Sequence, residues 1–340
     1  MRTLAWQSPP FFELLQGIAP QAFPSVTTPV CGLVRNDSKN FGETMNKTIY
    51  ALGFFDGVHI GHAALLDACR RLAREQGCDA GVITFGTHPE ALVLGTSPKL
   101  INTPKDREWL LRERFSMDPV VTLPFDEQMR TMPWEDFLEV LRRRLGAAGF
   151  VCGADFRFGY RGQGTAALLT EYCAERNLPC TVVPDQTIDG IRVSSTYIRQ
   201  QLETGDMATA VKFLGHPHIL SGTVIHGRAL GRKIGVPTAN VALPEGLAVP
   251  KFGVYACSCL IDGVRYPAVT NLGHRPTVEG RNVRVEAWIL DYNGDLYDRE
   301  ITVEFHYFLC PEQKFPSLEA LQAEIHRNAA ETRNYLKNLR

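Results

Sequence analysis

Two histidines, His59 and His62, stand three residues apart in the glycine-rich sequence GFFDGVHIGH, residues 53–62. The run from Thr48 to Phe55 is apolar and β-prone, and apolar residues recur at helical spacing after the turn, so a strand passes into a helix here. Glycines let the backbone approach an anion, and a helix N-terminus offers free N–H groups. Two imidazoles at this position can donate hydrogen bonds to phosphoryl oxygens, which indicates a phosphate site that needs no metal.

An isolated pair of histidines has simpler explanations. Most such pairs are chance or packing features, and a zinc pair needs further ligands, which this sequence does not group around residues 59–62. The two histidines belong to a ten-residue motif, residues 53–62, at a strand-to-helix turn, and this context favours the phosphate site.

A second stretch with phosphate chemistry covers residues 222–240, where spaced glycines and basic side chains precede Thr238 and Asn240. The combination suits ATP with Mg²⁺, because cationic side chains balance phosphate charge and hard oxygen ligands suit an octahedral ion that retains several waters. Glu286, in a β-prone run, is the candidate base that orients and deprotonates a substrate hydroxyl. From the pattern alone, plain turns and a solvent-facing strand residue are the alternative explanation.

Length and composition set the class of protein. A chain of 340 residues exceeds one typical core, so two domains are expected, and 44% hydrophobic with 21% charged residues is ordinary for a globular protein. A formal charge of −1 without a dense basic stripe gives no electrostatic footprint for nucleic acid. Nine cysteines lack paired Cys-x-x-Cys spacing, and no apolar run is long enough to span a membrane. We expect a cytoplasmic protein with reduced thiols and neither nucleic-acid nor membrane partners.

The chain divides into three segments. Residues 1–44 contain several prolines and no periodicity, and form a poorly defined extension for which Met45 is an alternative start. Residues 45–204 alternate strand-like runs with helical patterns such as Trp134–Leu145, which predicts a parallel, doubly wound, Rossmann-like α/β sheet. Ligands of such sheets bind at the carboxyl ends of the strands, where the turn with the two histidines would open.

Residues 205–340 have a different texture. Asp262-Gly263 and Asn293-Gly294 are each flanked by β-prone runs, which predicts two β-hairpins within an antiparallel β-barrel. Apolar residues from Leu318 to Leu336 recur at helical spacing behind Ser317, a good N-cap. A C-terminal helix is therefore expected to pack on the outside of the barrel.

The first motif resembles the FAD synthetase branch of the nucleotidyltransferase superfamily, and residues 153–159 and 194–199 are similar to two further motifs of that branch. The resemblance implies that His59, His62 and Arg199 stabilise the charge of the transition state. It also implies nucleotide- or flavin-binding roles for seven residues: Gly53, Phe54, Asp56, Gly61, Asp155, Ser195 and Thr196. Helix capping alone would also explain the hydroxyls of residues 194–196.

The second motif resembles the flavokinase loop that ends in Pro-Thr-Ala-Asn, and residues 284–292 are similar to the flavokinase strand with the catalytic glutamate. This resemblance implies that Glu286 is the base, that Thr238 and Asn240 hold Mg²⁺, and that four residues bind nucleotide or flavin: Gly227, Gly231, Pro237 and Arg275. The family commonly has an arginine where this chain has Cys310, and often an acid near Asn328.

From Thr48 to Leu336 the whole chain resembles the prokaryotic bifunctional riboflavin kinase/FAD synthetases. This implies two steps, riboflavin + ATP to FMN + ADP in the second domain and FMN + ATP to FAD + pyrophosphate in the first. Riboflavin, FMN and ATP are then the partners, and self-association stays open. The alternatives are that only one activity is live, or that the protein is a flavin-binding regulator. A class I aminoacyl-tRNA synthetase shares the histidine pair but also needs a Lys-rich second motif and a tRNA-binding surface, and the sequence shows neither. A glycerol-phosphate or phosphopantetheine-type transferase would explain only residues 48–200 and would leave the second motif and Glu286 without a role.

Overall fold

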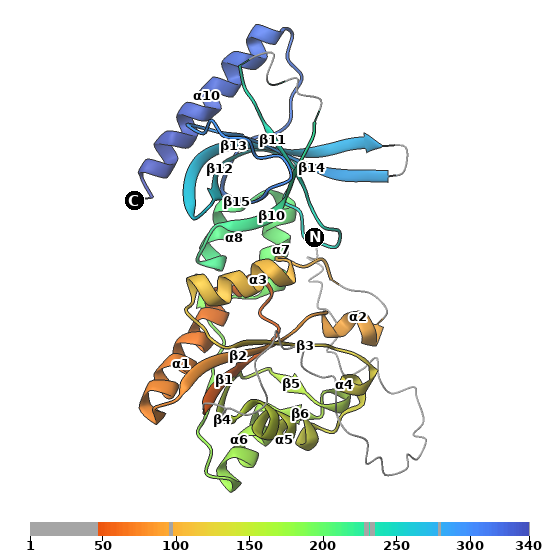
Figure 1. Cartoon of the computed structure of the whole chain (residues 1–340), viewed down its shortest axis with the longest axis vertical. Coiled ribbons are helices and arrows are strands. Elements are labelled where there is room, and N and C mark those ends of the chain that lie inside the picture. Colours follow the sequence, from red (N-terminus) through yellow and green to blue (C-terminus); the bar gives the residue numbers. More distant parts are fainter. Residues whose placement is uncertain (1–46, 95–97, 228–230, 232–234, 278–279, 340) are drawn as a thin grey trace, which may run out of the picture. The chain divides into compact units, whose positions relative to one another are not determined.

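The computed structural model describes residues 47–94, 98–227, 231, 235–277 and 280–339 (Figure 1). The predicted extension 1–44, its alternative start at Met45, and the basic residues 228 and 232–233 of the second motif lie outside this part of the chain. The domain boundaries at 44/45 and 204/205 stay predictions.

The first domain is built on a five-stranded parallel sheet (Figure 1). Its strand order is β3-β2-β1-β4-β7. The bounds are Thr48–Leu52 for β1, Asp79–Phe85 for β2, Val120–Leu123 for β3, Ala147–Gly153 for β4 and Cys180–Val183 for β7. All five residues of β1 are buried, because helices cover both faces of the sheet, and this is why β1 reads as an unbroken apolar run. The strand order reverses at β1, so a ligand site is expected beyond its carboxyl end.

The two faces of the sheet are covered by different helices. Ile49 and Ala51 pack in one core with Leu66 and Cys69 of α1 (Ile60–Gln76). The alternate residue Tyr50 points to the other face, where its hydroxyl donates to the carbonyl oxygen of Leu145 at 3.2 Å. That carbonyl ends α5, whose bounds Trp134–Leu145 are those predicted from the sequence. The doubly wound α/β prediction is confirmed.

Short elements complete this domain. The remaining helices are α2 (Pro89–Leu94), α3 (Pro104–Trp109), α4 (Glu127–Thr131), α6 (Ala166–Glu175) and α7 (Ser195–Thr204). Helix α8 (Met207–Leu214) follows the predicted boundary at 204/205, and its buried residues belong to the same core cluster as the second domain. Single turns of 3₁₀ helix lie at Asp56–Val58 and Tyr160–Gly162, a π-turn lies at Leu110–Arg114, and the strands β5 (Arg157–Phe158), β6 (Gly164–Thr165), β8 (Thr187–Ile188) and β9 (Ile191–Arg192) form two small hairpins.

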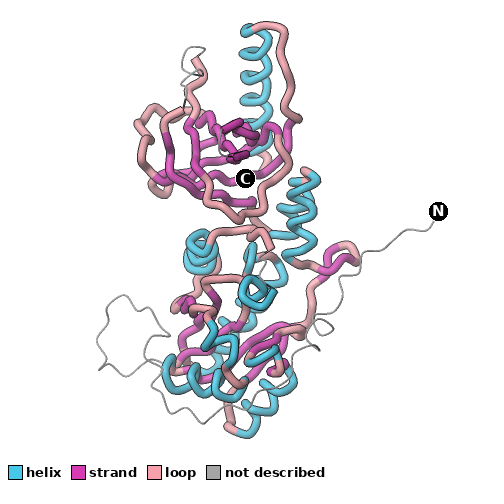
Figure 2. The backbone as a smooth tube through the Cα atoms, turned by 90° about the vertical axis from the view of Figure 1, so that its right-hand side faces the viewer, coloured by secondary structure: helices cyan, strands magenta, loops and turns pink. Residues whose placement is uncertain are grey.

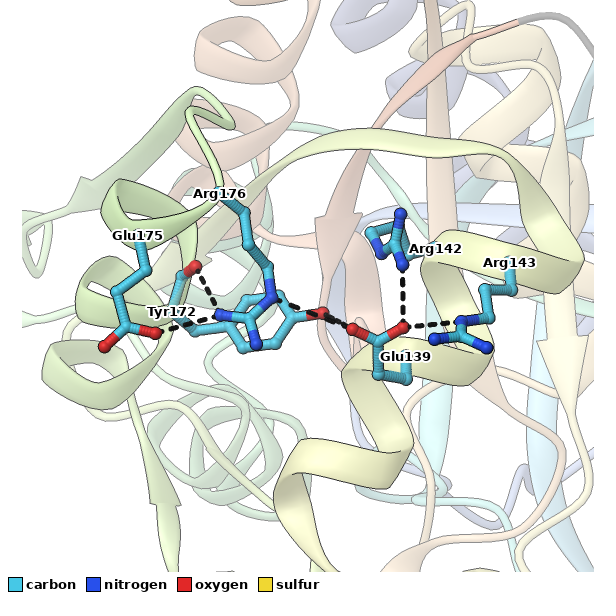
Figure 3. Close-up of polar contacts among 6 residues, drawn as sticks. All are labelled: Glu139, Arg142, Arg143, Tyr172, Glu175 and Arg176. Atoms are coloured by element: carbon cyan, nitrogen blue, oxygen red, sulfur yellow. Dashed lines mark hydrogen bonds and ion pairs between the residues drawn. The ribbon is translucent and has the colours of Figure 1, made fainter.

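A polar network around Glu139 joins α5 to α6 (Figure 3). The carboxylate pairs with Arg142 at 2.9 Å and Arg143 at 2.8 Å on its own helix, and accepts the hydroxyl of Tyr172 at 2.9 Å from α6. The guanidinium of Arg176 lies 3.9 Å from the centre of the Tyr172 ring. These donors, Arg142 above all, lower the pKa of Glu139 to about 2. The network therefore fixes two helices that cover the sheet, and it lies among residues to which the sequence assigned no chemistry.

The second domain is a closed antiparallel barrel, as predicted, shown with its strands in magenta in Figure 2. The strand order around the barrel is β10-β11-β14-β13-β12-β15. The bounds are His218–Ile225 for β10, Ala239–Ala242 for β11, Gly253–Ile261 for β12, Val264–Thr277 for β13, Gly280–Ile289 for β14 and Glu300–Cys310 for β15. Alternate residues such as Tyr255, Cys257 and Cys259 are fully buried in the barrel core. All eight cysteines in the described part of the chain are free thiols.

One of the two predicted hairpins is wrong. Asp262-Gly263 does join β12 to β13, but Asn293-Gly294 does not join two paired strands. Strand β14 pairs with β13 on one edge and with β11 on the other, so neither edge is left for β15. Strand β15 instead pairs with β10 and β12 and closes the barrel. A two-residue turn signal reports only local backbone preference, and here barrel closure decides the pairing.

The C-terminal helix α10 (Leu318–Lys337) confirms its prediction. Ser317 is the N-cap, and its hydroxyl accepts the backbone N–H of Ala320 at 3.2 Å. Ala329 of the helix is buried against Val269 and Leu290, so α10 covers the outside of the barrel beside β13 (Figure 1).

Buried histidines give this fold an acid-sensitive stability, and His218 is the clearest case. It is fully buried, neither ring nitrogen has a partner among the described residues, and burial lowers its pKa to about 3. Between pH 6.5 and 3 the unfolded chain binds a proton at this residue that the folded chain excludes, so stability is lost as pH falls through that window. His218→Phe is expected to raise the unfolding free energy by about 1 kcal/mol at pH 7, because an unpaired polar ring is removed.

Denaturant unfolding of both proteins from pH 7.5 to 4.5 measures this effect. The variant should lose less stability than wild type on acidification. If the unfolding free energies of both proteins changed equally with pH, the assignment would be contradicted. Repacking of the new side chain against Phe305, whose ring centre is 6.0 Å from that of His218, adds only a difference that is the same at every pH.

Candidate active sites

The first candidate site is the turn between β1 and α1, where the backbone adopts an uncommon left-handed conformation. Phe55 and Gly57 both have positive φ, at 60° and 81°. The carboxylate of Asp56 is nearly buried and accepts the backbone N–H of Ile101 at 2.9 Å. The turn is thereby fixed from within the domain and placed at the carboxyl end of the central strand.

The two histidines lie face to face. Their ring centres are 3.6 Å apart and the planes differ by 10°. His59 is the N-cap of α1, and its Nδ1 accepts the backbone N–H of His62 at 3.3 Å, so the proton of a neutral His59 ring is on Nε2. A Cβ on Gly61 would lie 3.2 Å from the His59 ring, so a larger residue at position 61 would crowd the ring.

Both histidines are neutral at physiological pH. Burial lowers the pKa of His59 to about 4, and burial together with the adjacent His59 lowers the pKa of His62 well below its ordinary value. Each ring can therefore donate one hydrogen bond but carries no positive charge of its own. Positive charge at this site must come from arginine.

Arg199 supplies such a charge. Its Nη1 pairs with Oδ2 of Asp56 at 2.8 Å, and its Nη2 donates to the hydroxyl of Thr196 at 3.3 Å. Burial raises the pKa of Asp56, and Arg199 opposes that rise. The ion pair joins α7, at residue 199, to the turn after β1, so motifs far apart in sequence meet here.

The other predicted residues of this site fall into two groups. Ser195 contacts the turn, since its hydroxyl donates to the carbonyl oxygen of Asp56 at 2.9 Å, whereas Ser194 is the helix N-cap. Gly53 and Phe54 lead from β1 into the same turn. Asp155 is exposed and pairs with Arg192, so its described contacts do not join it to the histidine pair.

Sequence reasoning missed several residues that complete the turn. Arg107 is almost fully buried, with its guanidinium carbon 4.3 Å from the centre of the Phe54 ring. Asn102 donates its backbone N–H to Asp56 at 3.4 Å. His216 lies beneath the turn, with Nε2 3.0 Å from the carbonyl oxygen of Gly57. Arg107 is a single arginine on a short helix and belongs to no sequence motif. Only the fold could show that it lies beside the histidine turn.

The second candidate site lies on adjacent strands of the barrel. Asn240 on β11 is the register partner of Glu286 on β14, and Asn271 on β13 is the partner of Glu286 on its other side. Glu286 is one-fifth exposed and forms an ion pair with Arg284 two residues earlier, on the same side of the strand. The predicted base and one predicted metal ligand are therefore neighbours.

The glycines of the second motif make room for these side chains. A Cβ on Gly227 would lie 2.3 Å from the amide nitrogen of Asn240, and one on Gly231 would lie 2.1 Å from the carbonyl oxygen of Val236. A larger residue at either position would displace the loop or its contact. Pro237 is exposed just before β11. The side chain of Arg275 lies outside the described residues, although its backbone belongs to β13.

The donor set of this site fits Mg²⁺. The hydroxyl of Thr238 and the amide oxygen of Asn240 are hard oxygen donors, and magnesium in nucleotide sites takes few protein ligands because phosphates and waters supply the rest. Thr238 lies near the position of Gly231, with its hydroxyl 3.7 Å from a Cβ built there. Within the described ranges there is no group of three or more His, Cys, Asp or Glu residues that could hold a metal by themselves.

A Rossmann-like domain with a histidine turn, followed by a barrel in which Asn240 lies beside Glu286, is the architecture of a two-domain class of enzymes that transfer phosphoryl-type groups. Family models agree, since residues 42–197 match FAD synthetase and residues 214–336 match riboflavin kinase. The chain belongs to the bifunctional riboflavin kinase/FMN adenylyltransferases. The family predicted from the motifs is confirmed.

Named relatives cover both domains. The enzyme of Pseudomonas fluorescens is 39% identical over 290 residues, which is 84% of this chain and 92% of the relative. The enzyme of Listeria monocytogenes is 32% identical over 86% of this chain and 93% of its own length. A crystal structure described as a macrolide-efflux protein from Streptococcus pneumoniae has a TM-score of 0.77 and 30% identity over 86% of this chain and 95% of that chain. Across the described residues, no helix is long and apolar enough to cross a membrane.

Proposed function

We propose that this protein makes FAD from riboflavin in two steps, each at one of the two sites. The barrel phosphorylates riboflavin with ATP to give FMN, and the Rossmann-like domain adenylylates FMN with a second ATP and releases pyrophosphate. The observation that carries the proposal is the joining of separate motifs: Arg199 pairs with Asp56, three residues before His59 in the same turn, and Asn240 lies beside Glu286.

In the kinase step, Glu286 would accept the proton of the ribityl 5′-hydroxyl while that oxygen forms a bond to the γ-phosphorus of ATP and the bond to the β-phosphate breaks. Arg284 forms an ion pair with this carboxylate and so orients it before substrate binds. Thr238 and Asn240 would hold Mg²⁺, which when bound balances the charge of the ATP phosphates. A carboxylate beside the metal ligands matches what a phosphoryl transfer to an alcohol requires.

In the adenylylation step, a phosphate oxygen of FMN would attack the α-phosphorus of ATP as the bond to the β-phosphate breaks, with pyrophosphate as the leaving group. The neutral rings of His59 and His62 donate hydrogen bonds, and Arg199 balances the charge that develops on the leaving group. No covalent enzyme intermediate is required, because positioning and electrostatics carry such transfers. Gly61, Ser195 and Thr196 would line the nucleotide, as would Gly53 and Phe54.

The remaining predicted residues belong to this proposal as well. Gly227, Gly231 and Pro237 would line the ATP of the kinase site, and Arg275 and Asp155 would bind nucleotide or flavin. A cytoplasmic location is also part of the proposal.

Separation of flavins after incubation of the purified chain with riboflavin and excess Mg·ATP tests both steps, beside a parallel reaction started from FMN. FMN followed by FAD is the expected result. Unchanged riboflavin with conversion of FMN to FAD would contradict the kinase assignment, and accumulation of FMN without FAD would contradict the assignment of the histidine turn. Tight binding of FMN or FAD without turnover would support the flavin-binding regulator instead.

A further inference from the structure

Arg107, on α3, lies behind the histidine turn, although no motif marks it. Only 1% of its surface is exposed, and its Nη2 donates to the carbonyl oxygen of Phe85, at the end of β2, at 2.5 Å. Its guanidinium is stacked on the ring of Phe54, which in turn contacts the ring of His88 with centres 4.6 Å apart. Burial is the main reason that the pKa values of His62 and His88 are low, and the charge of Arg107 lowers both further.

The charge of Arg107 is not balanced by an acid of its own. Asp56 is near enough to interact with it, but Oδ2 of Asp56 is engaged by Arg199 at 2.8 Å and Oδ1 accepts the backbone N–H of Ile101. Within the part of the chain that the structure describes, Nε and Nη1 of Arg107 have no hydrogen-bond partner. A buried cation with unpaired N–H groups is costly unless an anion completes it.

Two further buried polar groups around the turn are incomplete in the same way. The side-chain amide of Asn102, which is 1% exposed, and Nδ1 of His62 also have no partner among the described residues. Both residues adjoin the turn, Asn102 through its backbone bond to Asp56 and His62 through its stacked ring. Water can satisfy such N–H groups, but only an anion also neutralises a guanidinium.

We propose that Arg107 is a further substrate-binding residue of the transferase site, whose Nε and Nη1 donate to a phosphate oxygen of a substrate. The inference rests on the proposed adenylylation of FMN. A guanidinium presents two parallel donors that match phosphate geometry. The Phe54 ring covers one face of the Arg107 guanidinium, so a phosphate would reach the donors after rotation of this half-buried side chain. The shared chemistry is phosphate, from either ATP or FMN.

Arg107→Met and Arg107→Lys test the proposal in the full-length protein, with Arg112→Met as matched control. Arg112 follows Arg107 by five residues but is partly exposed and paired with Glu108 at 2.9 Å. The measurements are kcat and KM for ATP and FMN in FAD formation, and KM for pyrophosphate in the reverse reaction. For Arg107→Met we expect a fall in kcat/KM of about 100-fold. The fall should be smaller for Arg107→Lys, which keeps the charge but loses the two parallel N–H donors of the guanidinium. The riboflavin kinase rate of each variant should equal that of wild type.

The two phosphate sources separate in the kinetics. Raised KM values for ATP and pyrophosphate place Arg107 on the leaving pyrophosphate, whereas a raised KM for FMN alone places it on the flavin phosphate, and either result supports the proposal. Unchanged kinetics of Arg107→Met would overturn it.

Stability without substrate separates binding from a structural role. Removal of an incompletely paired charge should leave the unfolding midpoint of Arg107→Met no lower than that of wild type. A clearly lower midpoint, with both activities reduced together, would make Arg107 a structural residue and overturn the proposal. Wild-type protein that forms no FAD from FMN would contradict the proposed function itself, whereas active wild type with an equally active Arg107→Met contradicts only this inference.

Discussion

Glu286→Gln is expected to lower the riboflavin kinase rate about 10³-fold, within the usual contribution of a general base. The amide keeps the size of the side chain and its place opposite Asn240, but it cannot accept the proton of the ribityl hydroxyl. Conversion of FMN to FAD by the same protein should stay at the wild-type rate, because the transferase site contains no residue of β14. Rates of FMN and FAD formation, followed by separating the flavins, give both values from one preparation.

Two controls separate the base from the ion pair that it forms. Arg284→Gln breaks the pair with Glu286 but keeps the carboxylate, so only a small loss of kinase rate is expected. Glu324→Gln makes the same chemical change on α10, where the carboxylate pairs with Arg327. If Arg284→Gln lost as much activity as Glu286→Gln, the carboxylate would act through the ion pair and not as a base.

Arg199→Met is expected to lower the rate of FAD formation by about 10² to 10³, the usual cost of removing one donor that stabilises transition-state charge. The two histidines cannot replace this charge, since burial keeps both rings neutral. The riboflavin kinase rate should not change. Steady-state kinetics with FMN and ATP measure the loss, which should fall mainly on kcat.

The same variant leaves Asp56 buried without its partner, so a second change distinguishes the two causes of a loss. Asp56→Asn in the Arg199→Met background removes the unpaired carboxylate while it keeps an oxygen for the backbone N–H of Ile101. If Arg199 acts on the substrate, the double variant should be as slow as the single one. Recovery of most of the activity would show that Arg199 serves only to neutralise Asp56.

The outline of the fold could be predicted from local patterns. The buried β1 reads as an unbroken apolar run, and α5 and α10 begin and end close to where periodicity and Ser317 placed them. The failed hairpin at Asn293-Gly294 shows the limit of such patterns. A turn dipeptide reports the preference of a few residues, whereas the partner of β15 depends on which strand edges remain when the barrel closes.

By itself the sequence determined the family, the order of the domains and the two phosphate motifs, because motif residues and their spacing are local properties of the chain. Only the tertiary structure brought Arg199 to Asp56 across 143 positions and set Asn240 beside Glu286. It also decided the neutral state of the histidines and the unbalanced charge of Arg107, because burial and the identity of neighbours set the pKa values and partners of ionisable groups. Those properties arise from folding, and no single segment of the sequence determines them.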